Sequence, residues 1–257
     1  MNKLLNINNL TVRQGVHTKL EALDLVLYES QVNVLIGESG VGKSLLIRAL
    51  LGALPPHFEM TYDTWQYCGQ TIETLKPYLG RQVGYISQDY THSFNDHTTI
   101  GKQLIGIYRQ HYQVSRQVAA QQVQKALAWV GLDHIDLSKR YRFMLSGGQL
   151  ERVLIASVMM LEPKLIIADE PTAALDAVTG HQIMTLLHHL AKQHDVTLLV
   201  VTHNLTHVYR FSDYIYVMKD GHIVDDGDMN HFQSTHIHPY SAYLFRHRSL
   251  LKQGEVK

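Results

Sequence analysis

The sequence predicts an α/β protein with a mainly parallel core sheet and a helical segment inserted into it. Short apolar strands alternate with helices, which is typical of a parallel sheet covered by helices. A glycine-rich loop joins one strand to a helix, and three predicted helices follow one another in the middle of the chain. The 257 residues, 45% of them hydrophobic, suffice for a sizeable core in one large domain or a domain with a subdomain.

Apolar runs or alternating apolar residues predict the strands, and apolar residues at helical spacing predict the helices. The strand at 32–36 is bounded by Gly37, and the spacing becomes helical from Lys43. Polar breaks separate the three helices that lie between about Asp89 and Leu161. The expected strands are 4–12, 20–27, 32–36, 83–86, 165–168, 197–201, 214–218 and 222–224, and the expected helices are 43–54, 100–112, 115–130, 146–161, 177–193 and 239–251.

Charge and cysteine content exclude several classes of protein. Lys plus Arg and Asp plus Glu are both 23, so the chain lacks the basic footprint of a nucleic-acid-binding domain. Cys68 is the single cysteine, which excludes an intramolecular disulfide and fits a reducing compartment. The N-terminus lacks a signal-peptide pattern, and no apolar run approaches the about 20 residues of a membrane span. We therefore expect a chain that is soluble by itself but able to dock onto a membrane protein.

The strongest functional signal is an eight-residue loop between a predicted strand and a predicted helix. It matches the phosphate-binding pattern G-x-x-x-x-G-K-[ST], whose glycines let backbone N–H groups turn toward phosphate oxygens. Lys43 adds a positive charge at the β- and γ-phosphates, and Ser44 supplies a hydroxyl to Mg²⁺. The predicted nucleotide-binding residues are Gly37, Glu38, Ser39, Gly40, Val41, Gly42, Lys43 and Ser44.

A second element places two carboxylates at the end of the apolar strand 165–168. Ligands of open α/β sheets bind at the carboxyl edge of the strands. Asp169 is placed to hold Mg²⁺, and Glu170 is placed to polarise the attacking water as a general base. The two elements together predict a nucleoside triphosphatase, without saying which kind.

A third motif, Leu145–Gln149, opens another predicted helix. Ser146 is a good N-cap, and the two following glycines allow an anion to approach the exposed backbone N–H groups. Since one γ-phosphate already has its cradle, this helix end would serve the nucleotide of another subunit. With this motif as the signature sequence, the chain resembles the ATP-binding subunits of ABC transporters over nearly its whole length.

Three more segments, in the family's order and spacing, carry this resemblance: Gln88 matches the Q-loop, Ala174-Leu175-Asp176 the D-loop, and His203 the switch histidine. The resemblance implies that two subunits enclose two ATP molecules head to tail. Gln88 would sense Mg²⁺ and the attacking water, and His203 would contact the γ-phosphate and orient Glu170. The implied site residues are catalytic Glu170, His203 and Gln88; signature Ser146, Gly147, Gly148 and Gln149, which face the partner's ATP; D-loop Asp176; and Mg²⁺ ligands Ser44, Asp169 and Gln88.

The resemblance also implies the fold and the domain organisation. The fold is that of a P-loop NTPase of the ABC ATPase type, with a mainly parallel core sheet, an N-terminal antiparallel β part and an inserted helical subdomain. A single ABC ATP-binding domain spans 1–257. Its core with the β part is 1–88 and 162–227, its helical subdomain is about 89–161, and a C-terminal extension is about 228–257.

One position departs from the family pattern. ABC ATPases usually place an aromatic residue just after the first strand, where it stacks on adenine. Here Gln14 occupies that place, so adenine stacking is expected to be weak or to come from Arg13 or His17.

Two further segments resemble the oligopeptide, dipeptide and nickel importers of this family. They are Ser93-Phe94-Asn95-Asp96, where Asp96 replaces the usual proline, and His238-Pro239-Tyr240-Ser241 near the C-terminus. The cysteine-rich cluster of some members is absent, since only Cys68 exists. Within that group the sequence is most similar to the nickel-import ATP-binding subunits of Gram-positive bacteria.

This similarity implies the cofactors ATP and Mg²⁺ and a peripheral position on the cytoplasmic face of the cell membrane. The implied partners are a second, different ABC ATPase subunit, two membrane-spanning permease subunits and, indirectly, an extracytoplasmic solute-binding protein, but no nucleic acid. Residues from about Asp89 to Gln103 would receive a coupling helix of a permease subunit; alternatively, this segment is a solvated loop.

Three other functions are compatible with parts of the sequence. The cargo can be a dipeptide or oligopeptide, because the ATPase does not touch it. An ABC ATPase acting on DNA or ribosomes is disfavoured by the single cassette, the short distance from Lys43 to Ser146 and the absent basic surface. A plain metal-binding protein is suggested by 17 histidines, but only His203 has a strong functional case. The spacing of His188, His189 and His194 on one predicted helix does not suit a shared metal ion. His231, His236 and His238 could converge, but two of them lie in a segment that resembles a loop of the family, so solvated or packing roles are favoured for both sets, with metal sensing at the C-terminus as the alternative.

Overall fold

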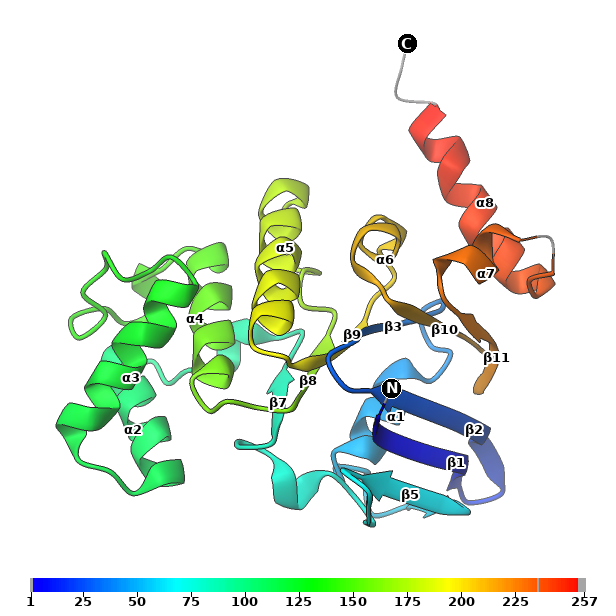
Figure 1. The fold of residues 1–257 in the computed structure, drawn as a ribbon, viewed down its shortest axis with the longest axis horizontal. Helices are drawn as coiled ribbons and strands as arrows, with labels where there is room; N and C mark the ends of the chain where they lie inside the picture. Colours follow the sequence, from blue (N-terminus) through cyan, green and yellow to red (C-terminus); the bar gives the residue numbers. More distant parts are fainter. Residues whose placement is uncertain (1, 235, 254–257) are drawn as a thin grey trace. The chain divides into compact units, whose positions relative to one another are not determined.

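The predicted α/β fold is confirmed, with one antiparallel sheet and a second sheet that contains parallel pairs and one antiparallel pair (Figure 1). The structure is a computed structural model and describes residues 2–234 and 236–253. Contacts divide the described chain into two compact units. The first comprises the described parts of Met1–Lys76 and Leu199–Lys257, and the second is Pro77–Leu198. The domain boundaries expected from the sequence remain a prediction, and residues 254–257 of the expected extension lie outside the described part.

The first unit begins with an antiparallel sheet in the order β2-β1-β5-β6, with β4 also paired to β1. Apolar and polar residues alternate along these strands, because every second side chain of a strand faces the core. Leu5 and Ile7 of one strand and Trp65 and Tyr67 of another are almost fully buried. The strands are β1 (Lys3–Gln14), β2 (His17–Tyr28), β4 (Phe58–Thr61), β5 (Thr64–Tyr67) and β6 (Gln70–Thr71).

The first unit also contains strands of the second sheet. All five residues of β3 (Val32–Ile36) are buried, and β3 pairs in parallel with β10 (Tyr214–Lys219). β11 (His222–Gly227) pairs antiparallel with β10 on its other side. The helices of this unit are α1 (Lys43–Leu50), α6 (Leu205–Phe211), α7 (Met229–Gln233) and α8 (Pro239–Gln253).

The second unit combines a parallel strand pair with the predicted helical segment. β7 (Val83–Ile86) and β8 (Leu165–Asp169) run in parallel, with Ile86 opposite Ala168. β9 (Thr197–Val201) contains the boundary between the two units. The helices are α2 (Ile100–Tyr112), α3 (Arg116–Trp129), α4 (Gly147–Met159) and α5 (Ala177–Gln193), with short 3₁₀ turns η1 (Lys76–Tyr78), η2 (Tyr90–His92) and η3 (Arg142–Met144).

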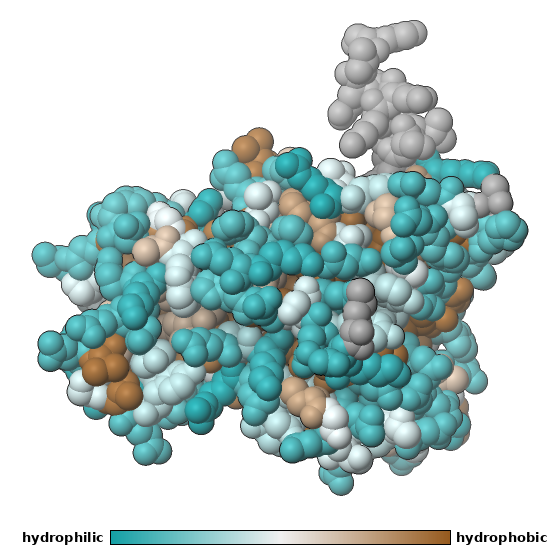
Figure 2. Space-filling model, viewed as in Figure 1, coloured by the Kyte–Doolittle hydropathy of each residue, from teal (hydrophilic) through white to brown (hydrophobic). Residues whose placement is uncertain are grey.

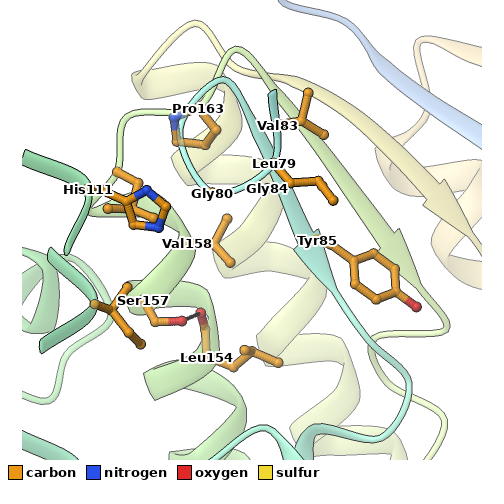
Figure 3. Close-up of a pocket in the computed structure, with 12 residues that line it drawn as sticks. Leu79, Gly80, Val83, Gly84, Tyr85, His111, Leu154, Ser157, Val158 and Pro163 are labelled. Atoms are coloured by element: carbon orange, nitrogen blue, oxygen red, sulfur yellow. Dashed lines mark hydrogen bonds between the residues drawn. The ribbon is translucent and has the colours of Figure 1, made fainter. Parts of the chain in front are cut away.

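An apolar pocket of about 310 Å³ lies in the second unit and is lined by residues of β7, α2 and α4 (Figure 3). Gly84 brings β7 close to α4, since a Cβ atom there would lie 2.2 Å from Val158 Cγ1. The Ser157 hydroxyl turns back onto its own helix and donates to the Leu154 carbonyl oxygen at 2.7 Å. None of the residues predicted to act on nucleotide lines this pocket.

The structure differs from the sequence-based expectation at a few elements. The helix expected at 43–54 ends at Leu50, where the chain turns through Gly52 at a positive φ of 63°. Strands β4, β5 and β6 and the short helices α6 and α7 were not predicted. Each has seven residues or fewer, too short to give a strong periodic pattern.

The outer surface carries few large apolar side chains, and the face in Figure 2 is mainly hydrophilic with small hydrophobic patches. Among the described residues, no helix combines the length and the apolar character that crossing a bilayer requires. The exposed large hydrophobic residues include Phe143 and Met144, which immediately precede the signature segment.

Candidate functional site

The loop predicted to bind phosphate lies in the first unit, between β3 and α1. Gly42 caps α1 with a left-handed backbone, φ 113°, and a Cβ atom there would lie 2.6 Å from Leu20 Cδ2, so only glycine fits. The buried Lys43 donates from Nζ to the carbonyl oxygens of Gly37, at 2.7 Å, and Glu38, at 2.9 Å. The ammonium group is therefore already inside the loop, in contact with oxygen atoms of the kind that a phosphate would supply.

His203 lies on a short turn of the same unit, next to the strand that leads into this loop. The Thr202 N–H donates to the Leu35 carbonyl oxygen at 3.1 Å, so the end of β9 adjoins β3. Asn204 then caps α6, accepting the Thr206 N–H at 3.1 Å, while its own N–H donates to the Thr202 hydroxyl at 3.0 Å. These bonds hold the exposed His203 between two fixed residues.

The second unit brings the predicted Q-loop and acidic residues to the same edge of its strand pair. Gln88 and Glu170 each lie two residues beyond the paired Ile86 and Ala168, and parallel strands end at the same edge of a sheet. Asp169 is buried, whereas Glu170 is partly exposed and has a left-handed backbone with φ 49°. This conformation is uncommon outside glycine and is strained before a proline, here Pro171.

The signature and D-loop segments line one pocket of about 450 Å³ in this unit. Ser146 and Gln149 form a capping box: the Gln149 N–H donates to Ser146 Oγ at 3.3 Å, and the Ser146 N–H donates to Gln149 Oε1 at 3.0 Å. A Cβ atom on Gly148 would lie 2.7 Å from Thr179 Cγ2, so glycine lets α4 approach α5. The first turn of α4 contains no acidic residue, which leaves its positive end open to an anion.

The N-terminus of the neighbouring helix α5, unlike that of α4, is capped by a carboxylate, which belongs to Asp176. Its carboxylate caps α5 by accepting the N–H groups of Val178 and Thr179, both at 3.0 Å. The hydrogen bonds from Thr179 hold the pKa of Asp176 below its usual value, so the carboxylate stays charged. Of the two helix ends that line this pocket, α5 therefore carries its own anion and α4 does not.

A smaller pocket of about 340 Å³ joins the Q-loop to the D-loop. It is lined by Gln88, Asp89, Tyr90 and Thr91 on one side and by Ala173 and Ala174 on the other. Tyr90 and Ala174 line the signature pocket as well. Within the second unit, the three segments that the sequence singled out are thus neighbours.

Comparison with known proteins decides the family. The family model described as ABC transporter matches residues 20–173, more than half of the chain. The chain belongs to the ABC transporter family. It is 51% identical over 251 residues to the nickel import system ATP-binding protein NikD of Staphylococcus aureus strain USA300, covering 97% of this chain and 98% of that one. The NikD protein of strain MRSA252 is 50% identical over the same shares.

A solved structure agrees with this assignment. The structure of CbiO1 from Clostridium perfringens, part of the ABC transporter complex CbiONQ, has a TM-score of 0.80 and 25% identity. The match covers 91% of this chain and 92% of that one. The resemblance recognised in the sequence is therefore confirmed, and this ABC protein is an ATP-hydrolysing transporter subunit.

Arg142, which had no role in the sequence analysis, connects two segments of this ABC subunit. The guanidinium of Arg142, four residues before Ser146, bonds to the Thr91 carbonyl oxygen and to the carboxylate of Asp96, whose Oδ2 lies 3.0 Å from Arg142 Nη2. The hydrogen bond from Arg142 holds the pKa of Asp96 below its usual value. Asp96, which stands where the family usually has a proline, thus connects the segment after the Q-loop to the residues just before the signature helix.

Glu151 is a second feature that sequence reasoning missed. This glutamate on α4 is fully buried, and in the described part of the chain neither carboxyl oxygen has a hydrogen-bond partner. Burial raises its pKa from 4.5 to about 8. The pKa of Tyr90 is raised by burial and, to a smaller extent, by Glu151. Glu151 lies four residues before the buried Ile155, a spacing that could have marked it as core-facing.

Replacement of Glu151 by glutamine is expected to flatten the pH dependence of stability. The folded protein binds more protons here than the unfolded chain, so this stabilisation is complete below pH 4.5 and is lost as the pH rises toward about 8. The loss amounts to about 3 kcal/mol between pH 5 and pH 8, or roughly 6 to 12 °C in melting temperature. Melting curves at these two pH values should show this decrease for the wild type and a much smaller one for Glu151→Gln. Equal decreases in both proteins would contradict the buried, protonated state.

The remaining histidines whose side chains the structure describes show no arrangement suited to a metal ion. Among the residues that the structure describes, no group of three or more His, Cys, Asp and Glu side chains could hold one. His194 instead packs its ring against Trp129, with 4.6 Å between the ring centres. Arg13, Gln14 and His17 lie at the β1–β2 turn, where Gln14 pairs with His17, and an adenine-stacking role for any of them remains a prediction.

Proposed function

We propose that this chain hydrolyses ATP to energise the import of nickel ions, as one of two different ATP-binding subunits of an importer. The observation that carries this proposal is 51% identity, over 97% of the chain, to a protein named as the ATP-binding protein of a nickel import system. Two permease subunits would form the membrane path, and a solute-binding protein would deliver nickel to them. The chain itself would lie on the cytoplasmic face of the membrane as a peripheral subunit and would bind no nucleic acid.

ATP would bind to the loop from Gly37 to Ser44, with Lys43 at the β- and γ-phosphates. Ser44, Asp169 and Gln88 offer a hydroxyl, a carboxylate and an amide oxygen, and such oxygen donors suit Mg²⁺. When bound, this ion neutralises charge on the phosphates. Glu170 would accept a proton from the attacking water, and His203 would orient that water and contact the γ-phosphate. The exposure of His203 and the partial exposure of Glu170 support these roles.

The signature residues Ser146, Gly147, Gly148 and Gln149 would contact ATP held by the partner ATPase, next to the D-loop residue Asp176. The open, positive end of α4 at the wall of a pocket supports an anionic ligand there. Phe143 and Met144, 69% and 46% exposed just before this helix, support burial against another subunit. A head-to-tail dimer would thus use each chain's loop and its partner's signature helix for one ATP.

The segment from Asp89 to Gln103 would receive a helix of a permease subunit. Exposed residues such as His92, Asn95 and His97 support a contact surface. The bonds from Arg142 to Thr91 and Asp96 support transmission of movement from this surface to the signature helix. A movement at the permease contact would therefore reach the partner's nucleotide through residues of the second unit.

Uptake in living cells tests the transported substrate. A strain lacking this chain is expected to lose uptake of radiolabelled nickel, to regain it when the wild-type chain is supplied, and to keep normal uptake of a radiolabelled dipeptide. Intact nickel uptake together with lost dipeptide uptake would contradict the proposal and assign the chain to a peptide importer.

A further inference from the structure

The C-terminal extension reaches the phosphate-binding loop within the first unit. The Glu38 N–H donates to the hydroxyl of Tyr240 at 3.3 Å, across 202 residues of sequence. The carbonyl oxygen of the same peptide group belongs to Gly37 and accepts the Lys43 ammonium at 2.7 Å. One peptide group therefore has Tyr240 on its N–H side and the phosphate-binding lysine on its C=O side.

Tyr240 is itself held firmly. Its side chain is buried, and Lys219 Nζ lies 5.1 Å from the centre of its ring, within cation–π range. Its backbone N–H donates to His238 Nδ1 at 3.2 Å. Buried, packed aromatic side chains have little rotational freedom, so the hydroxyl is presented to the loop in one position.

The sheet anchors this segment through Asp225 of β11. One carboxylate oxygen, Oδ2, accepts the His238 N–H at 2.9 Å, and the other, Oδ1, lies 2.7 Å from His231 Nε2. The chain of contacts thus runs from Asp225 through His238 and Tyr240 to the Glu38 N–H. Two of the histidines that first suggested a metal site form this anchor instead.

We propose that Tyr240 is a positioning residue for ATP binding: its hydroxyl fixes the Gly37–Glu38 peptide and thereby the place from which Lys43 meets the phosphates. In the structure Lys43 Nζ contacts two carbonyl oxygens of the loop. The ammonium group has three N–H donors and must turn at least one of them toward a phosphate oxygen to contact ATP. A peptide fixed from its N–H side holds the loop backbone in place while the ammonium does so. This inference rests on the proposed role of the loop in binding ATP.

The test is ATP affinity of the purified full-length chain in the presence of Mg²⁺, measured for Tyr240→Phe. This change removes the hydroxyl and keeps the ring. Loss of one hydrogen bond to the loop is expected to raise the Kd for ATP about 2- to 10-fold. The rate at saturating ATP in the assembled complex should stay near wild type. The lost bond itself is expected to lower the melting temperature without nucleotide by no more than a few degrees, whereas a merely structural role would lower the melting temperature and leave Kd unchanged. An unchanged Kd overturns the proposal.

Two further variants serve as controls for this measurement. Tyr243→Phe is the matched control, because this tyrosine lies one turn further along α8 and is 50% exposed; it should bind ATP as the wild type does. Lys43→Ala should lose most ATP binding. If Lys43→Ala binds normally, the loop assignment fails and the Tyr240 proposal fails with it. If Lys43→Ala loses binding while Tyr240→Phe does not, the Tyr240 proposal alone fails.

Hydrogen exchange of the wild-type chain gives a measurement that does not depend on any variant. Glu38 and Ser39 are both exposed, but the Glu38 amide hydrogen should exchange more slowly than that of Ser39, because Tyr240 accepts it. Equal, fast exchange of both amides would overturn the proposal.

Discussion

Glu170→Gln is expected to stop ATP hydrolysis at the site built on this chain while ATP binding stays intact. Glutamine has nearly the same size and keeps one side-chain oxygen, but it cannot accept a proton from the attacking water. Removal of a general base costs about 10²- to 10⁴-fold in rate. In the complete complex, total hydrolysis should fall by about half if the two sites are equally active and independent, and nearly to zero if they work in alternation. Phosphate release and ATP affinity are the quantities to measure.

Glu162→Gln is the matched control for this experiment. Glu162 precedes β8, as Glu170 follows it, and it also has a left-handed backbone, with φ 53°. The two changes are chemically identical, yet only Glu170 lies at the carboxyl edge of the strand. Unchanged turnover with Glu170→Gln would remove this residue as the base, and equal losses in both variants would indicate a structural defect.

Lys43→Ala is expected to abolish most ATP binding and, with it, hydrolysis at this site. A charge-assisted contact to phosphate is worth about 1.5 to 3 kcal/mol, which corresponds to a roughly 10- to 100-fold higher Kd. The variant also loses the two bonds from Nζ to the loop carbonyl oxygens, so the loop should become less ordered. Calorimetric titration of the full chain with ATP and Mg²⁺ measures this effect.

Lys3→Ala controls for the loss of a lysine in the same unit. Lys3 is exposed on β1 and donates to Asn6 Oδ1 at 3.3 Å, far along the sequence from the loop. This variant should bind ATP normally. Wild-type affinity in Lys43→Ala would show that the loop does not bind the phosphates.

Local chemistry explains why much of the fold, and the elements on which the candidate site residues lie, could be predicted. Glycines at fixed spacing before Lys43, the apolar strand before Asp169 and the Ser146 N-cap each depend on a few neighbouring residues. β4 to β6 were missed because each has four residues or fewer. A sequence pattern with so few positions does not separate a strand from a turn.

Tertiary packing explains what could not be predicted. The burial of Glu151 depends on the elements that surround α4, and the bond from Glu38 to Tyr240 joins residues 202 positions apart. The His-Pro-Tyr-Ser segment served in the sequence analysis only to indicate a group of importers. In the structure its tyrosine contacts the phosphate-binding loop, an arrangement that no local pattern encodes.

Nickel accumulation by the purified complex tests the central claim most directly. Vesicles containing the complete complex, with its solute-binding protein on one side and ATP with Mg²⁺ on the other, are supplied with radiolabelled nickel or a radiolabelled dipeptide. The account predicts ATP-dependent accumulation of nickel with the wild-type chain, clearly reduced or absent accumulation with Glu170→Gln, and no accumulation of dipeptide. Accumulation of dipeptide alone, or nickel accumulation that Glu170→Gln leaves unchanged, would contradict it.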